Sequence, residues 1–168
     1  MKIVALAVLG LMAALALSPP ALADTLDLSL ANPTQFAPLG TVLSFTATVS
    51  TPLTNTGDVY LNADSTTVDS PLTLDDAPFF SNFPLFLAPG GSFTGVLFTV
   101  DVPLSAALNV AYNGSFEIDG GADNNAVDDL ASVTFKVTAI ATPEPSSVIL
   151  LLTGLFGAAV VMGRKRRR

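Results

Sequence analysis

The chain contains no cysteine, no histidine and no tryptophan. Without cysteine no disulfide can stabilise the fold, so its stability must come from a packed apolar core. Without histidine and cysteine the chain cannot build a Ser-His-Asp or Cys-His catalytic site, or a His-ligated transition-metal site. These absences exclude several large enzyme classes before any motif is considered.

Basic residues are nearly missing from the middle of the chain. Between Thr25 and Thr142, Lys136 is the only base, whereas every acidic residue of the chain except Asp24 and Glu144 lies there. An acidic segment of this kind repels nucleic-acid phosphates and lacks the cationic patch of a DNA- or RNA-binding protein. We therefore expect no nucleic-acid partner.

The remaining enzyme class to consider is glycoside hydrolysis, which needs only two carboxylates facing each other across a cleft. The middle of the chain offers one glutamate, Glu117, and many aspartates that fall mostly in turns without a companion motif. We expect no enzymatic activity and no cofactor.

The N-terminus has the order of a secretory signal. Lys2 gives a positive start, residues 3–17 form an uninterrupted apolar run, and Ala21 and Ala23 supply the small residues that signal peptidase inspects. We predict that residues 1–23 are a signal peptide and that Asp24 is the mature N-terminus. The alternative is an uncleaved membrane anchor.

Three segments follow one another at the C-terminus. The first is Pro143-Glu144-Pro145, which the prolines should keep extended and accessible. The second is an apolar segment that predicts a short transmembrane helix over residues 148–163. The third is the basic tail Arg164, Lys165, Arg166, Arg167 and Arg168, which should stop transfer on the cytoplasmic side. The residues upstream would then face outward.

In these residues the chain resembles the PEP-CTERM sorting signal of exopolysaccharide-producing bacteria, over about positions 142–168. The resemblance implies recognition by an exosortase, a membrane enzyme that would cut near Pro143-Glu144-Pro145 and pass the protein from an inner-membrane intermediate to the cell surface or extracellular matrix. It also implies a structural or adhesive role in exopolysaccharide or biofilm. The alternative is a plain tail anchor in which the motif is incidental.

Between the two termini, residues 24–141 show a two-residue period of apolar side chains. Four segments place alternate apolar residues on one face: Leu43, Phe45, Ala47 and Val49; Val96, Phe98, Val100 and Val102; Val110, Tyr112, Phe116 and Ile118; and Val133, Phe135, Val137 and Ala139. Shorter strands are expected at Leu26–Leu30 and Asp58–Asn62. Period-two segments without a helical stripe predict an antiparallel β-sandwich of six or seven strands and no helices.

Turn residues connect these segments. The turn Asn55-Thr56-Gly57-Asp58 and the corner at residues 87–92 supply residues that tolerate a positive φ or preset a bend. In these turns and in the expected strand at residues 112–118, the part of the chain at residues 24–141 resembles bacterial immunoglobulin-like modules. The resemblance implies an immunoglobulin-like sandwich and says little about activity.

Residues 66–89 fit the strand pattern poorly, because they combine four prolines with several phenylalanines. Prolines at that density exclude a central strand. We predict an irregular crossover between the two sheets whose aromatic side chains cover one end of the core. The alternative is an exposed aromatic patch that binds sugar rings or a partner.

Two polar stretches are candidates for binding. The acidic loop at residues 119–129 could hold calcium, although its spacing departs from the EF-hand pattern, and a solvated hairpin loop explains it as well. Asn113-Gly114-Ser115 is formally a glycosylation sequon, but within a strand we expect an Asn-Gly kink or bulge. A carbohydrate- or calcium-binding surface receptor is therefore the alternative function to the matrix role.

Overall fold

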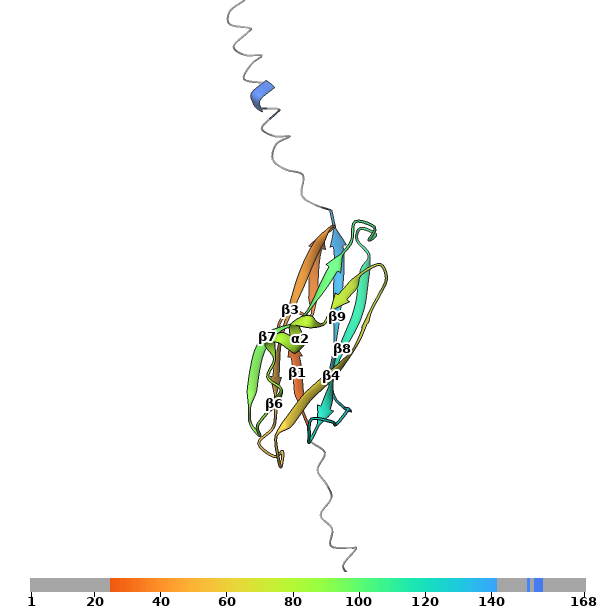
Figure 1. The fold of residues 1–168 in the computed structure, drawn as a ribbon. Coiled ribbons are helices and arrows are strands. Elements are labelled where there is room, and N and C mark those ends of the chain that lie inside the picture. Colours follow the sequence, from red (N-terminus) through yellow and green to blue (C-terminus); the bar gives the residue numbers. More distant parts are fainter. Residues whose placement is uncertain (1–24, 142–150, 152, 156–168) are drawn as a thin grey trace, which may run out of the picture.

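The computed structural model describes residues 25–141, 151 and 153–155. Their strands form two sheets that pack face to face (Figure 1). The first sheet has the order β1-β3-β7-β5 and the second β2-β9-β8-β4-β6. The strands are β1 Asp27–Leu30, β2 Thr34–Pro38, β3 Thr41–Ser50, β4 Val59–Val68, β5 Thr73–Asp75, β6 Phe86–Leu87, β7 Ser92–Val102, β8 Ala111–Gly121 and β9 Asp128–Ile140. The predicted all-β sandwich is confirmed.

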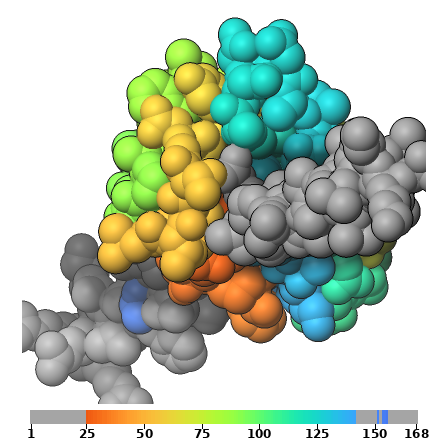
Figure 2. All heavy atoms as spheres, turned by 90° about the horizontal axis from the view of Figure 1, so that it is seen from below, coloured from red at the N-terminus to blue at the C-terminus, as the bar shows by residue number. Residues whose placement is uncertain are grey.

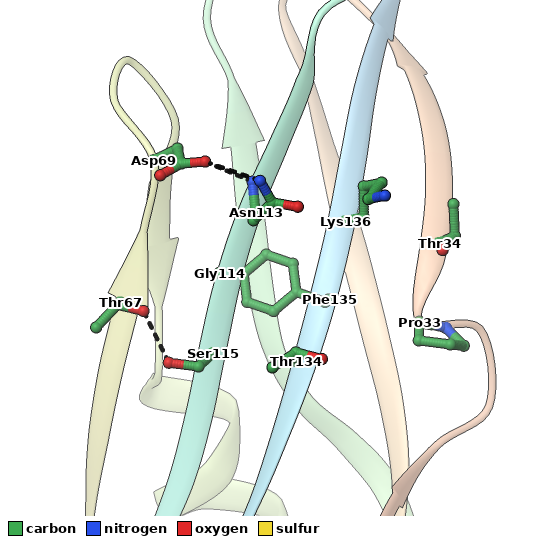
Figure 3. A pocket seen from close by; sticks show the side chains of 10 residues that line it. All are labelled: Pro33, Thr34, Thr67, Asp69, Asn113, Gly114, Ser115, Thr134, Phe135 and Lys136. Atoms are coloured by element: carbon green, nitrogen blue, oxygen red, sulfur yellow. Dashed lines mark hydrogen bonds between the residues drawn. The ribbon is translucent and has the colours of Figure 1, made fainter.

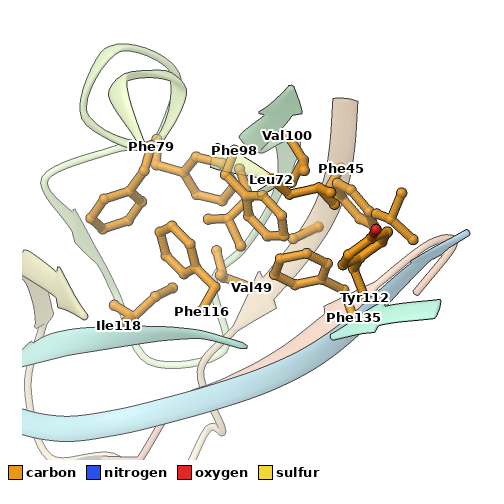
Figure 4. Close-up of a cluster of buried hydrophobic side chains, with 14 of the residues drawn as sticks. Phe45, Val49, Leu72, Phe79, Phe98, Val100, Tyr112, Phe116, Ile118 and Phe135 are labelled. Atoms are coloured by element: carbon orange, nitrogen blue, oxygen red, sulfur yellow. The ribbon is translucent and has the colours of Figure 1, made fainter. Parts of the chain in front are cut away.

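The alternation of apolar and polar side chains predicted the buried faces of β3 and β9. Phe45, Ala47 and Val49 are buried from β3, and Phe135, Val137 and Ala139 are buried from β9. Phenylalanines from both sheets meet at the centre, as Figure 4 shows. The ring of Phe98 stacks on Phe45 at 4.8 Å and on Phe116 at 5.2 Å between centroids. This aromatic column is the centre of the core.

In the other two long segments the predicted orientation is wrong for two side chains. Leu97 was expected opposite the core, yet both Leu97 and Phe98 are buried. The register between β3 and β7 shifts at Phe45/Thr46, and an extra residue at such a bulge turns two successive side chains inward. Val110 was expected in the core, but it precedes β8 and is exposed.

The strand β2 was not predicted. It pairs parallel to β9, from Thr34 beside Lys136 to Pro38 beside Ile140, so the sandwich is not wholly antiparallel. Pro33 precedes this strand and Pro38 is its last residue, so the sequence pattern did not indicate a strand here. An edge strand tolerates proline because one side of its backbone needs no partner.

The expected irregular crossover at residues 66–89 is partly wrong. The strand β4 continues to Val68, and the edge strands β5 and β6 follow around a short helix, α2 Ala77–Asn82, where no helix was expected. A proline in the first turn and the backbone hydrogen bond from Phe83 N to Phe79 O at 3.1 Å fit this helix. Phe79 and Phe83 are buried, so the predicted packing role is confirmed for these two side chains, whereas Phe80 and Phe86 are exposed.

The predicted terminal segments lie almost wholly outside the described residues. Leu151 and residues 153–155, which fall within the predicted membrane segment, are helical. In the described part of the chain no helix has the length and apolar character needed to cross a membrane.

Candidate functional site

The outer face of the five-stranded sheet carries a shallow groove of about 620 Å³ (Figure 3). It runs across β4, β8, β9 and the start of β2. The groove is lined by Pro33, Thr34, Thr67, Asp69, Asn113, Gly114, Ser115, Thr134, Phe135 and Lys136.

The strand period explains why polar groups line this groove. In β8, Tyr112 and Phe116 point into the core, so the residues between them, Asn113 and Ser115, point outward. Ser115 lies directly between Thr67 of β4 and Thr134 of β9, which makes a row of three hydroxyl groups across the sheet. The hydroxyl oxygens of Thr67 and Ser115 lie 2.7 Å apart and share a hydrogen bond.

The floor of the groove is made by Gly114 and Phe135, which are partners across β8 and β9. The Phe135 ring covers Gly114, and a Cβ atom at position 114 would overlap the ring and lie 2.6 Å from the Thr67 carbonyl oxygen. A glycine is therefore required here to admit the ring. The expected kink or bulge at Asn113-Gly114-Ser115 is wrong, because this segment pairs in regular register.

One carboxylate and one ammonium group belong to the groove. The Asp69 side chain accepts hydrogen bonds from the backbone N and the Nδ2 of Asn113, at 2.8 and 3.3 Å, which fixes the carboxylate beside the groove. Lys136 is exposed, and its side chain has no hydrogen bond or ion pair with any residue of the described ranges. The one base of an acidic domain is thus available to a ligand.

The groove presents hydroxyl, amide, carboxylate and ammonium groups in one hollow. These groups donate to and accept from the hydroxyls of a polyol or sugar. Phe135 is 3% exposed, so its ring lies beneath the surface and offers little face for stacking. Recognition in this groove would therefore depend on hydrogen bonds.

A second candidate site is a carboxylate cluster on β8 and β9, made of Glu117, Asp119 and Asp129. One oxygen of each lies within 4.8 Å of the others. Asp119 is directly opposite Asp129, after a register shift between Ile118 and Asp119. The Ser65 hydroxyl donates to Asp119 Oδ2 at 3.1 Å, while Asp119 Oδ1 is buried and has no hydrogen-bond partner.

Two carboxyl groups in this region have raised pKa values, Glu117 mainly through repulsion by a neighbouring charge and Asp64 mainly through burial. The negative charge of Asp129 is the main cause of the raised pKa of Glu117, followed by partial desolvation and the charge of Asp119. Burial, and then the charges of Asp76 and Asp119, raise the pKa of Asp64 from 3.8 to about 6. A bound cation would relieve this repulsion, and carboxylate oxygens are the ligands that calcium prefers.

The acidic loop considered in the sequence divides into two parts in the structure. Asp119 and Asp129 join the cluster, whereas Asp123 caps a turn by accepting a hydrogen bond from Asn125 N at 2.8 Å. The hairpin-loop interpretation therefore fits the loop tip. Glu117 was not among the candidate calcium ligands. It lies two residues before Asp119 on the same face of β8, and the pairing of β8 with β9 brings Asp129 to both.

The residues predicted for sorting and processing lie outside the described residues, so the structure does not place them. They are Ala21, Ala23, Pro143, Glu144, Pro145, Arg164, Lys165, Arg166, Arg167 and Arg168.

By its fold the described part of the chain is an all-β sandwich domain. No family model and no curated protein matches the chain. Among solved structures, it is similar to a family 123 glycoside hydrolase from Clostridium perfringens, studied for glycolipid glycan hydrolysis, with 14% identity, a TM-score of 0.40, and coverage of 72% of this chain and 28% of that chain. It is also similar to domains 4 and 5 of the S-layer protein SbsC, with 15% identity, a TM-score of 0.39, and coverage of 70% and 47%. The chain thus spans less than half of each, and similarity this low gives no information about function.

Proposed function

We propose that this chain is an exported surface protein with a structural or adhesive role in an extracellular polysaccharide matrix. The observation that carries the proposal is the order of the C-terminal segments: the Pro143-Glu144-Pro145 motif, the apolar segment at 148–163 and the basic tail at 164–168. The last strand of the sandwich ends at Ile140, so the motif begins just after the folded domain. A processing enzyme could therefore cut there without unfolding a strand.

We further propose that the sandwich is immunoglobulin-like. The orders β1-β3-β7-β5 and β9-β8-β4 correspond to the ABED and GFC sheets of that fold. Tyr112, at the start of β8, is buried, and its hydroxyl accepts a hydrogen bond at 2.8 Å from the backbone N of Ala107. A tyrosine bonded to the backbone a few residues upstream is the tyrosine corner of these domains.

The sorting proposal is tested by changing Glu144 to Ala in cells that carry an exosortase. One carboxylate outside the bilayer hardly alters the transfer of the apolar segment, so membrane insertion should persist. Release to the surface should stop if an enzyme recognises the motif. Equal retention of full-length wild type and Glu144→Ala would show that the motif is incidental and that the chain is an ordinary anchored protein.

A second candidate function is a carbohydrate- or calcium-binding surface receptor. The hydroxyl-lined groove favours the first ligand and the cluster of Glu117, Asp119 and Asp129 favours the second. Titration calorimetry with matrix polysaccharide and with calcium separates this function from a matrix role, because a receptor should show saturable binding. Asp119→Asn should abolish a calcium signal, whereas the exposed Asp101→Asn should not change it. In both functions we infer a non-catalytic protein, because the chain has no histidine or cysteine and its carboxylates have no companion motif of a glycoside hydrolase.

A further inference from the structure

Three segments at the end of the sandwich where β9 finishes contain no charged residue. They are residues 38–42, 103–111 and 139–141, none of which is Asp, Glu, Lys or Arg. Backbone hydrogen bonds hold these segments together, from Asn109 N to Ala139 O at 2.8 Å and from Gly40 N to Val102 O at 2.7 Å. We call these three segments together the C-terminal end of the sandwich. This end lies at the top of Figure 1.

The C-terminal end exposes large apolar side chains. Leu104 is 79% exposed, and Val42, Leu108 and Val110 are 62%, 44% and 43% exposed. The loop that carries three of them is fixed to the core, because Ala106 is buried within it and the tyrosine corner described above holds its backbone. The leucines are therefore presented to solvent by an ordered loop.

The acidic residues gather toward the opposite end, which Figure 2 views directly. There β4 and β9 begin, and β3 and β8 end. Carboxylates in or next to the strands and loops of that end are Asp27, Asp58, Glu117, Asp119, Asp123, Asp128 and Asp129. Beside its three segments, the C-terminal end carries two carboxylates: Asp101 is the cross-strand partner of Val42, and Asp69 follows β4 and accepts a hydrogen bond from Asn113 N. The sandwich thus has one strongly negative end and one end with fewer charges and exposed apolar side chains, which we call the apolar end.

Only residues 142–147 separate Ala141 from Val148, the first residue of the predicted membrane segment. At full extension this link spans roughly 25 Å. If the tail is in the membrane, the apolar end is held next to the bilayer and the negative end points away. This step rests on the anchored tail of the proposed function.

We propose that, while the chain is anchored, the C-terminal end of the sandwich docks on the lipid surface, with Leu104, Leu108 and Val110 entering the boundary between headgroups and acyl chains. Apolar side chains gain free energy on leaving water for this boundary. Carboxylates are repelled by anionic headgroups, so their clustering at the far end favours the same orientation. Docking would keep the Pro143-Glu144-Pro145 motif at the membrane surface, where a membrane enzyme works.

The test uses the exported chain, purified from the membranes of cells that lack the sorting enzyme and reconstituted in vesicles of phosphatidylcholine and phosphatidylglycerol. The chain has no cysteine, so Leu104→Cys gives a single site for an environment-sensitive nitrobenzoxadiazole label. The matched control is Leu53→Cys, whose side chain is 84% exposed at the opposite end. We expect the label at position 104 to shift to shorter wavelength and to lose most of its emission to a lipid-attached quencher. The label at position 53 should report water.

A second variant keeps the test independent of the label. In the Leu104→Cys chain, Leu108→Asp and Val110→Asp together should return the label to a water-like spectrum, because a carboxylate resists burial in lipid. Val127→Asp, at the opposite end, should have no effect. If the chain is anchored and the labels at positions 104 and 53 both show the emission of a label in water, the docking is refuted. The apolar end would then be available to bind a protein partner. Release of the chain from the vesicles by alkaline carbonate would refute both the anchored tail and the docking.

Discussion

The contact between Phe135 and Gly114 can be tested by a double-mutant cycle of the free energy of unfolding. Phe135 is buried, and its ring centroid lies 4.9 Å from that of Phe45 and 4.8 Å from that of Phe98. Removing the ring leaves a cavity in the aromatic column, so Phe135→Ala should lower the free energy of unfolding by about 3–5 kcal/mol. This is a large share of the stability of a typical domain.

Gly114→Ala should be destabilising for the complementary reason. The added Cβ atom would overlap the Phe135 ring and approach the Thr67 carbonyl oxygen at 2.6 Å. Overpacking of this kind costs about 1–3 kcal/mol. In the Phe135→Ala chain the ring is gone and only the carbonyl contact remains. The double variant should therefore be more stable than the sum of the single costs predicts, by about 0.5–3 kcal/mol.

Urea denaturation of residues 25–141, followed by circular dichroism, measures the four free energies. Thr134→Ala, on the exposed face of the same strand, is the control and should change stability by about 0.5 kcal/mol or less. Strictly additive costs at positions 114 and 135 would refute the packing of the ring over the glycine. A helical spectrum of the fragment would refute the sandwich itself.

Two further predictions concern charge and processing. Because the pKa of Asp64 is raised from 3.8 to about 6, the folded state binds more protons than the unfolded state between these pH values. The stability that the domain has while the Asp64 carboxyl is protonated is therefore lost as the pH rises through about 6. Asp64→Asn should therefore stabilise the domain at pH 7–8 and have little effect near pH 4. Thermal melts of the variant and the wild type at both pH values measure this difference. An equal effect of the substitution at both pH values would contradict the raised pKa. N-terminal sequencing of the exported chain should begin at Asp24, and Ala23→Phe should block processing; exported chain that still begins at residue 1 would contradict the cleavage site.

The sequence by itself determined the fold class and most of the core. Alternation in β3 and β9 correctly placed Phe45 and Val137 in the interior, because a half-buried strand must repeat every two residues. The absence of cysteine and histidine limited the possible chemistry without any coordinates. The terminal segments likewise depend on local composition, and their predictions rest on the sequence alone.

Tertiary structure decided the features that depend on register between distant segments. The parallel strand β2 is stabilised by its pairing with β9, a contact that no local pattern signals. The bulge opposite Phe45 turned Leu97 inward, and the shift at Ile118 brought Glu117 and Asp119 together with Asp129. A one-residue change in pairing moves a side chain to the other face of a sheet, so the groove, the carboxylate cluster and the two contrasting ends exist only once the strands have paired.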